Sequence, residues 1–283
     1  YFLKDMRNRD MTVTDTPPAQ FYGVLRQDSP ASRHAEIAEQ IRRLGYALLD
    51  SGFSETELAE FSDHFNNTRA RYIQKWGEES LKQANEFHTI RAAVTHGGPA
   101  FLKLIMNANL HAVLGQLIEG KYFLNQQNGI VNPPGETYNQ AIWHRDLPYQ
   151  HFTSSSPLAI NALFCVDDFT RENGSTFVLP ASHKSESFPS DSYIRDNALQ
   201  IEAKAGQYIL LDCMTFHGGG FNSTQKERRA VNHLFNIPYF KQQINLPRAM
   251  DAASLTDAER EMLGFVYQEP GSIEDYLAAR SGK

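Results

Sequence analysis

The clearest β signal in the chain is the run Tyr208-Ile209-Leu210-Leu211-Asp212-Cys213-Met214-Thr215-Phe216-His217-Gly218-Gly219-Gly220. It begins with apolar residues over the length of a strand, passes a histidine and enters three glycines. An apolar run that ends at glycine is typical of a strand buried in a core. The glycines leave space beside His217 for a ligand or a closely packed backbone. His217 could equally end a core strand before a flexible turn.

Similar β-rich runs recur along the chain and are divided by Gly, Pro, Asn and Ser. The six runs lie at 122–131, 141–145, 158–166, 176–179, 207–213 and 230–239. Several short strands at this spacing favour a β-sandwich, a jelly roll or a barrel. The sequence therefore predicts a β core of about 120 residues.

Helical patterns flank these runs. The first covers 32–44 and ends at Gly45, and Ser54-Glu55-Thr56-Glu57 fits a capping box ahead of a second helix. Further helical segments are predicted at 100–118, 254–263 and 273–279. Because no linker-like stretch divides these parts, we expect one domain over 31–283 after a tail over 1–30 that lies along the surface. Its parts are a helical region (31–120), the β core (121–240) and a C-terminal helical segment (241–283).

Composition excludes several classes of protein. The chain has 283 residues, 41% of them hydrophobic, and a formal net charge of −6. This acidic balance argues against a broad nucleic-acid-binding surface, and no apolar run approaches the ~20 residues of a membrane span. The only two cysteines, Cys165 and Cys213, lie in apolar runs. They are expected to be buried free thiols in a reducing, cytoplasmic compartment.

The string Trp143-His144-Arg145-Asp146 carries the first candidate metal ligands. In a strand, residues i and i+2 point to the same face, so His144 and Asp146 could reach one point in space. With His217 from a second strand they would complete the two-histidine, one-carboxylate triad of non-haem Fe(II) oxygenases. A His-x-Asp string alone is a weak signal, because composition produces it by chance.

Arg228 is the candidate anchor for an anion. It lies eleven residues after His217 at the start of a β-rich run, and an antiparallel return would direct it into the core beside His217. A buried guanidinium needs an anionic partner, and its fork fits a carboxylate. The neighbouring Arg229 would face outward. Alternatively, the two arginines form a solvated pair at the start of a strand.

These pieces resemble the phytanoyl-CoA dioxygenase-like branch of the Fe(II)/2-oxoglutarate-dependent oxygenases, and they occur in the family's order. The resemblance extends over roughly 35–240. It rests most on Asn173-Gly174 followed by Leu179-Pro180-Ala181-Ser182-His183-Lys184, where Ala181 replaces the usual glycine. The other matching pieces are Gly45-Tyr46-Ala47-Leu48-Leu49-Asp50, Trp143-His144-Arg145-Asp146, and His217 with Arg228.

The resemblance implies a mainly β fold with flanking helices, namely a double-stranded β-helix (a cupin-like jelly roll). It implies that His144, Asp146 and His217 bind iron and that Arg228 anchors 2-oxoglutarate. Gln127 and Asn161 are expected beside 2-oxoglutarate, although both could be satisfied core amides. His183 belongs to the signature, and we expect it to be structural.

The activity implied is that of an Fe(II)/2-oxoglutarate-dependent dioxygenase. It would hydroxylate an unactivated C–H bond of a small or medium organic metabolite, consume O2, and release succinate and CO2; ascorbate could support it. The presence of Asp146 disfavours halogenation. Desaturation or another oxidation, the substrate and the oligomeric state stay open. The alternatives are a non-catalytic cupin-like metal- or ligand-binding module and a Zn hydrolase.

Candidate substrate-binding residues lie on two segments that could cover the mouth of the β core. Tyr149, His151 and Phe152 follow the metal motif, and His88 and Arg91 lie in a helical insert predicted around 86–93. Aromatic rings with a few polar groups suit a small organic substrate. The same residues could instead only seal the end of the barrel.

Overall fold

The computed structural model describes residues 20–281. Residues 20–30 are exposed and contain no helix or strand. The prediction of a surface-lying tail falls largely on residues 1–19, which lie outside the described residues. Among the helices of the described part, none combines the length and apolar composition needed to cross a membrane.

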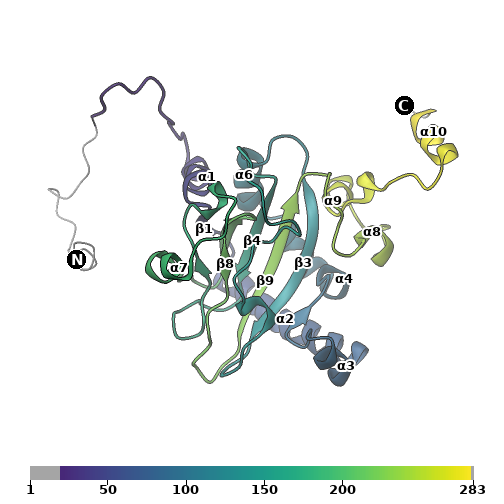
Figure 1. Ribbon diagram of the computed structural model, residues 1–283. Helices are drawn as coiled ribbons and strands as arrows, with labels where there is room; N and C mark the ends of the chain where they lie inside the picture. Colours follow the sequence, from purple (N-terminus) through teal and green to yellow (C-terminus); the bar gives the residue numbers. More distant parts are fainter. Residues whose placement is uncertain (1–19, 282–283) are drawn as a thin grey trace. The chain divides into compact units, whose positions relative to one another are not determined.

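The centre of the fold is a six-stranded antiparallel sheet in the order β1-β7-β4-β9-β3-β2 (Figure 1). A three-stranded antiparallel sheet has the order β6-β5-β8. In the large sheet the strands are β1 (Tyr46–Asp50), β7 (Gln207–Asp212), β4 (Ala159–Cys165), β9 (Arg228–Asn236), β3 (Phe123–Asn132) and β2 (Thr89–Ile90). In the small sheet they are β6 (Leu199–Gln200), β5 (Phe177–Val178) and β8 (His217–Gly218). The mainly antiparallel β fold with helices is therefore confirmed.

One face of the large sheet packs against helices (Figure 1). Alternate strand residues such as Phe164, Tyr208 and Val231 share one apolar core with helical residues such as Ile41 and Phe101. The helices that contribute to this core are α1 (Arg33–Leu44), α2 (Glu55–Trp76), α3 (Glu78–Gln83), α4 (Val94–Gly97), α5 (Pro99–Ile105), α6 (Ala108–Leu117) and α8 (Leu246–Ala249). Met262 of α9 (Asp257–Met262) packs against the same core, and the remaining helices are α7 (Asp191–Asn197) and α10 (Ile273–Ser281).

The opposite face of the large sheet packs against the small sheet and its neighbouring segments. Ile209 of β7 and Ala230 of β9 belong to a second apolar cluster, together with Phe169 and Val178. Because side chains alternate along a strand, each central strand supplies one row to the helices and one row to this second face. The candidate functional side chains lie on the second face.

The boundaries of the first two helices are set by local caps. The Ser32 side chain accepts a hydrogen bond from the amide of Ala35, and α1 ends at Gly45 with φ of 84°. Ser54 and Glu57 form the predicted capping box of α2. The helix predicted over 100–118 is in fact two helices. The first, α5, ends at Ile105, and the second, α6, begins after Asn107, whose side chain accepts a hydrogen bond from the amide of Leu110.

Two predicted elements are wrong. Residues 141–145 do not form a strand; His144 makes only an isolated antiparallel bridge with His217. The insert around 86–93 is not helical, because turns surround the short strand β2, which pairs with Ile130 and Gly129 of β3. Both segments are too short and too irregular for periodicity to identify.

Candidate metal centre

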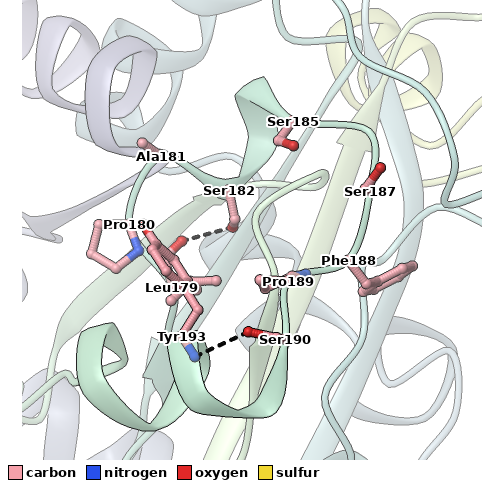
Figure 2. A pocket seen from close by; sticks show the side chains of 10 residues that line it. All are labelled: Leu179, Pro180, Ala181, Ser182, Ser185, Ser187, Phe188, Pro189, Ser190 and Tyr193. Carbon is pink, nitrogen blue, oxygen red and sulfur yellow. Dashed lines mark hydrogen bonds between the residues drawn. The ribbon is translucent and has the colours of Figure 1, made fainter.

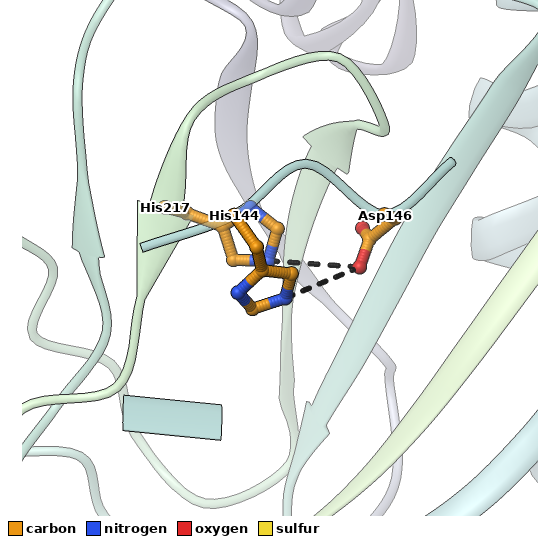
Figure 3. Close-up of side chains that lie close together, drawn as sticks. All are labelled: His144, Asp146 and His217. Carbon is orange, nitrogen blue, oxygen red and sulfur yellow. Dashed lines mark ion pairs between the residues drawn. The ribbon is translucent and has the colours of Figure 1, made fainter. Parts of the chain in front are cut away.

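His144, Asp146 and His217 bring one ligand atom each within 4.8 Å of the others (Figure 3). The Nε2 atoms of both histidines lie 3.7 Å from the same oxygen, Oδ1 of Asp146. The two imidazole rings have a centroid separation of 4.4 Å. The structure therefore brings together the three residues that the sequence singled out.

Backbone pairing fixes these three side chains. The amide of His144 donates to the carbonyl of His217 at 2.8 Å, and the amide of His217 donates back at 3.0 Å. The amide of Asp146 donates to the carbonyl of Cys213, just beyond the end of β7, at 2.9 Å. The sequence analysis expected a regular strand to bring the three side chains together. An isolated bridge between His144 and His217 and one hydrogen bond of Asp146 do so instead.

Further hydrogen bonds orient the side chains of His144, His217 and Asp146. The Nδ1 atoms of His144 and His217 lie 2.7 and 2.9 Å from the carbonyls of Ile142 and Thr215, so each Nδ1–H donates to a backbone oxygen. The Nε2 lone pairs then face Asp146. Asn161 donates through Nδ2 to Oδ2 of Asp146 at 2.9 Å, which leaves Oδ1 directed at the histidines. Such outer contacts are typical of metal-binding histidines and carboxylates.

The electrostatics favour an ionised carboxylate in this centre. Burial alone would raise the pKa of Asp146, but the nearby imidazoles of His217 and His144 and the Asn161 amide together lower it. Burial lowers the pKa of His217. Burial opposes the charged form of His144 too, but the interaction of its ring with the Asp146 carboxylate raises the pKa of that imidazole. One carboxylate and two imidazole nitrogens on one side of a shared point fit a divalent iron ion.

Arg228 lines the same cavity as the two histidines. Its side chain is buried, lies 3.9 Å above the ring of Phe169, and donates through Nη2 to the hydroxyl of Tyr138 at 3.1 Å. Its buried Nε has no partner, and no salt bridge to Arg228 is present among residues 20–281. A buried guanidinium in that state fits an anionic ligand.

Arg229 points to the other face of β9. The sequence analysis expected it to face solvent, but it does not. It forms a two-pronged ion pair with Asp167, at 3.0 Å from Nε and 2.6 Å from Nη2. It also donates to Ser62 and Asn66 of α2. The prediction that Arg228 and Arg229 point in opposite directions was right. The face of β9 that carries Arg229 is covered, because α2 packs on it.

The cavity also contains polar residues that the sequence analysis missed. Tyr138 and Gln140 lie in irregular or very short elements and gave no pattern, and Thr176 begins a predicted β-rich run that gave no sign of a role in the site. Asn232 was detectable, because it follows Arg228 by four residues along β9 and so shares its face. The full lining is Ile130, Tyr138, Gln140, His144, Asn161, Leu163, Thr176, Leu211, His217, Gly219, Arg228, Ala230 and Asn232.

Gln127 lies outside this cavity, which corrects its prediction as a co-substrate ligand. It is buried on the helix-facing side of β3 and donates to the carbonyl of Phe101 and to Nε2 of His233, both at 2.9 Å. A register shift between Leu124 and Gln126 changes the alternation within β3, and a sequence pattern does not reveal it. Asn161, by contrast, lines the cavity and contacts Asp146.

The loop residues predicted to bind substrate do not line the cavity either. Tyr149 and His151 are exposed, and Phe152 packs partly buried against an apolar cluster that includes Leu147 and Met214. Tyr149 and Phe152 stack with ring centroids 6.2 Å apart. The three side chains therefore lie outside the cavity, and the alternative in which they close one end of the core stays a prediction.

His88 and Arg91 are also outside the cavity. Arg91 forms a two-pronged ion pair with Glu86, at 2.9 and 2.6 Å. The Nε2 of His88 lies 3.9 Å from Glu136. The prediction placed both residues on a helical insert over the mouth, and the strand pairing of β2 holds this segment beside β3 instead.

A wider cavity of about 420 Å³ lies elsewhere and contains none of the predicted site residues (Figure 2). It is lined mainly by serine, proline and aromatic side chains between the turn of the family signature (Ser182–Lys184) and α7. We assign the chemistry to the smaller cavity, because the titratable groups converge there. Cys165 and Cys213 are both buried and unpaired, as expected for free thiols.

Comparisons with known proteins agree with this site. The family model of phytanoyl-CoA dioxygenase matches residues 41–230. The dioxygenase FUM3 of Gibberella moniliformis is 34% identical over 224 residues, which cover 72% of each chain. An iron/alpha-ketoglutarate-dependent dioxygenase of Aspergillus calidoustus, ausO, is 24% identical over 303 residues, covering 96% of this chain and 99% of that protein.

Among solved structures, EctD from S. alaskensis with 2-oxoglutarate and 5-hydroxyectoine superimposes with a TM-score of 0.61. It is 23% identical and covers 75% of this chain and 78% of its own, so it supports the fold. Together these relatives define the class as iron- and 2-oxoglutarate-dependent dioxygenases. Within that class, the chain belongs to the phytanoyl-CoA dioxygenase family. Iron and 2-oxoglutarate, the metal and co-substrate predicted from the sequence, are confirmed by these relatives and by the donor set.

Proposed function

We propose that this dioxygenase hydroxylates an unactivated C–H bond of a small or medium organic metabolite. The observation that carries the proposal is one cavity with two opposed features. At one point, two Nε2 lone pairs and a carboxylate oxygen converge; elsewhere, the buried guanidinium of Arg228 lacks an acidic partner among the described residues. A metal chelated by a dicarboxylic keto acid would satisfy both.

The chain's own residues have separate tasks in this proposal. His144, Asp146 and His217 hold iron on one side, which leaves the other side for ligands. Arg228 binds the distal carboxylate of 2-oxoglutarate, with Tyr138 orienting the guanidinium. When bound, iron supplies the activation of O2, so that substrate C–H, O2 and 2-oxoglutarate become C–OH, succinate and CO2.

The fold and cellular setting belong to the same proposal. We take the two antiparallel sheets over 31–283 as the halves of a double-stranded β-helix that encloses the cavity. The TM-score with EctD supports this assignment. The two buried thiols support a reducing, cytoplasmic setting. The 5-hydroxyectoine bound by EctD is a small molecule, which supports a small-molecule substrate here.

A succinate-release screen tests the proposal. The full chain is incubated with Fe(II), ascorbate, 2-oxoglutarate and a panel of metabolites, and succinate and oxidised products are measured. We expect at least one metabolite to raise succinate release and gain one oxygen atom, and Asp146→Ala to remove both signals. A folded wild type that binds metal but releases no succinate under any condition would instead indicate the non-catalytic metal-binding module.

A further inference from the structure

Arg145 stands between two proposed metal ligands, yet its side chain lies away from them. It is 2% exposed, and its guanidinium donates to four backbone carbonyls. The distances are 2.6 Å to Gln150, 2.9 Å to Glu186, 2.8 Å to Ser182 and 2.6 Å to Ser185. One side chain therefore ties the metal motif to the loop that follows it and to the signature turn.

Ser182 extends this connection to the third ligand. Its Oγ donates to the carbonyl of Leu179 at 2.7 Å (Figure 2). The same Oγ accepts a hydrogen bond from the amide of Phe216 at 2.8 Å. Phe216 immediately precedes His217, so Ser182 contacts the segment of His217 through its side chain and Arg145 through its carbonyl. The turn Ser182–Lys184 thus joins the segments that carry all three ligands.

Burial of Arg145 is compensated mainly by oriented carbonyl groups. Burial lowers the pKa of this guanidinium, and the nearby charge of Asp212 opposes that effect. No salt bridge to Arg145 is found within residues 20–281. The ring of Phe188 lies 5.0 Å from the guanidinium. A planar fork with five donors suits four carbonyls at fixed positions, whereas the ammonium of a lysine has three donors at one point.

We propose that Arg145 is a positioning residue for the metal centre. Through the Ser182 turn it fixes the His144–Asp146 segment relative to His217, and it thereby sets the affinity for the metal. This inference rests on the proposed iron-binding role of the three ligands. It gives the signature turn a task in holding the site, although no residue of that turn lines the cavity.

Metal titration separates this role from a general contribution to stability. Co(II), used as a probe that needs no turnover, is titrated into wild type, Arg145→Lys and Ser182→Ala while visible absorption and calorimetry are recorded. We expect Co(II) affinity to fall about 10- to 100-fold in both variants, as is typical for residues that support metal ligands. Arg171→Lys is the matched control, because Arg171 is 71% exposed, and its affinity should equal that of wild type.

Two further readouts make the test specific. The Michaelis constant for 2-oxoglutarate should stay near the wild-type value in both variants, because Arg228 is untouched, while kcat at subsaturating iron should fall. The double variant should lose less affinity than the product of the two single losses, because both act through one connection. If Arg145→Lys does not fold, Ser182→Ala tests the same connection alone.

The outcomes distinguish the two proposals. If wild type binds no Co(II) or Fe(II), the proposed metal site itself fails. If wild type binds the metal and folded Arg145→Lys and Ser182→Ala bind it equally well, the metal site stands and the positioning role of Arg145 is overturned.

Discussion

Asp146 is the residue on which the metal centre depends most. It supplies the only carboxylate of the triad, and both histidine Nε2 atoms face the same oxygen. We predict that Asp146→Ala abolishes iron-dependent succinate release in a protein that stays folded, because two neutral imidazoles bind Fe(II) weakly without the charge. Succinate assay and circular dichroism check this. Asp168→Ala, which removes a carboxylate paired with Lys204 outside the cavity, should retain activity.

Arg228 and Arg229 form a natural pair for a second prediction, because neighbouring residues of β9 point to opposite faces. Arg228→Lys should raise the Michaelis constant for 2-oxoglutarate about 10- to 100-fold, since a point charge replaces a two-pronged donor. Arg229→Lys should lower thermal stability through its contact with Asp167 and leave that constant unchanged. Steady-state kinetics decide, and the reverse pattern would mean that the face assignment is wrong.

At the scale of elements, the junction between α1 and β1 is a further testable feature. Gly45 has φ of 84°, and a Cβ there would collide with side chains of Thr215 and His183. Gly45→Ala should therefore destabilise the fold by about 2 kcal/mol or more, combining backbone strain with the collision. Denaturant unfolding measures this effect.

A matched glycine lies in α6. Gly115 has ordinary helical geometry and open space around its Cβ position, so Gly115→Ala should stabilise the protein by up to about 1 kcal/mol. Equal effects at Gly45 and Gly115 would show that the conformation of Gly45 is not required for the fold.

Elements with a strong local signal were predictable from the sequence, and those that depend on partners were not. The caps at Ser32 and Ser54 and the apolar runs of β4, β7 and β9 have local causes. Strands such as β2, β6 and β8 have two residues each, so only pairing with a neighbour defines them. Periodicity cannot detect such short elements.

The same distinction applies to the site. The three proposed ligands were found because the His-x-Asp string and His217 occur with the other pieces of the family signature in the family's order, and Arg228 because its phase along one strand could be counted. Gln127 was expected beside 2-oxoglutarate from the family resemblance alone, and it lies instead on the helix-facing side of β3, where it bonds as a core amide. The contacts of Arg145 were not predictable, since they join segments about 40 residues apart in the sequence.

For the whole molecule, the buried His233 predicts a pH dependence of stability. Burial lowers the pKa of His233 to about 4. The neutral ring donates from Nδ1 to the carbonyl of Ala162 and accepts at Nε2 from Gln127. Between pH ~6.5 and ~4 the unfolded chain binds a proton here that the folded chain does not, so stability falls as pH decreases. The loss reaches about 3 kcal/mol at the lower limit.

Urea unfolding at pH 7.5 and pH 5 measures this dependence. His233→Gln should be less stable at neutral pH but lose less stability on acidification than wild type. The exposed His151→Gln should keep the wild-type dependence. If His233→Gln lost as much stability between pH 7.5 and pH 5 as wild type, the pH dependence would come from other groups.

The central claim is that one cavity binds iron at His144, Asp146 and His217 and 2-oxoglutarate at Arg228. An anaerobic titration with Fe(II) and 2-oxoglutarate, followed by visible charge-transfer absorption, tests it most directly. For wild type we predict an absorption band that requires both Fe(II) and 2-oxoglutarate and saturates at one iron per chain. Asp146→Ala should give no band, and Arg228→Lys should give the same band at higher 2-oxoglutarate concentrations. A folded wild type that forms no such band, or an Asp146→Ala variant that forms it unchanged, would contradict the claim.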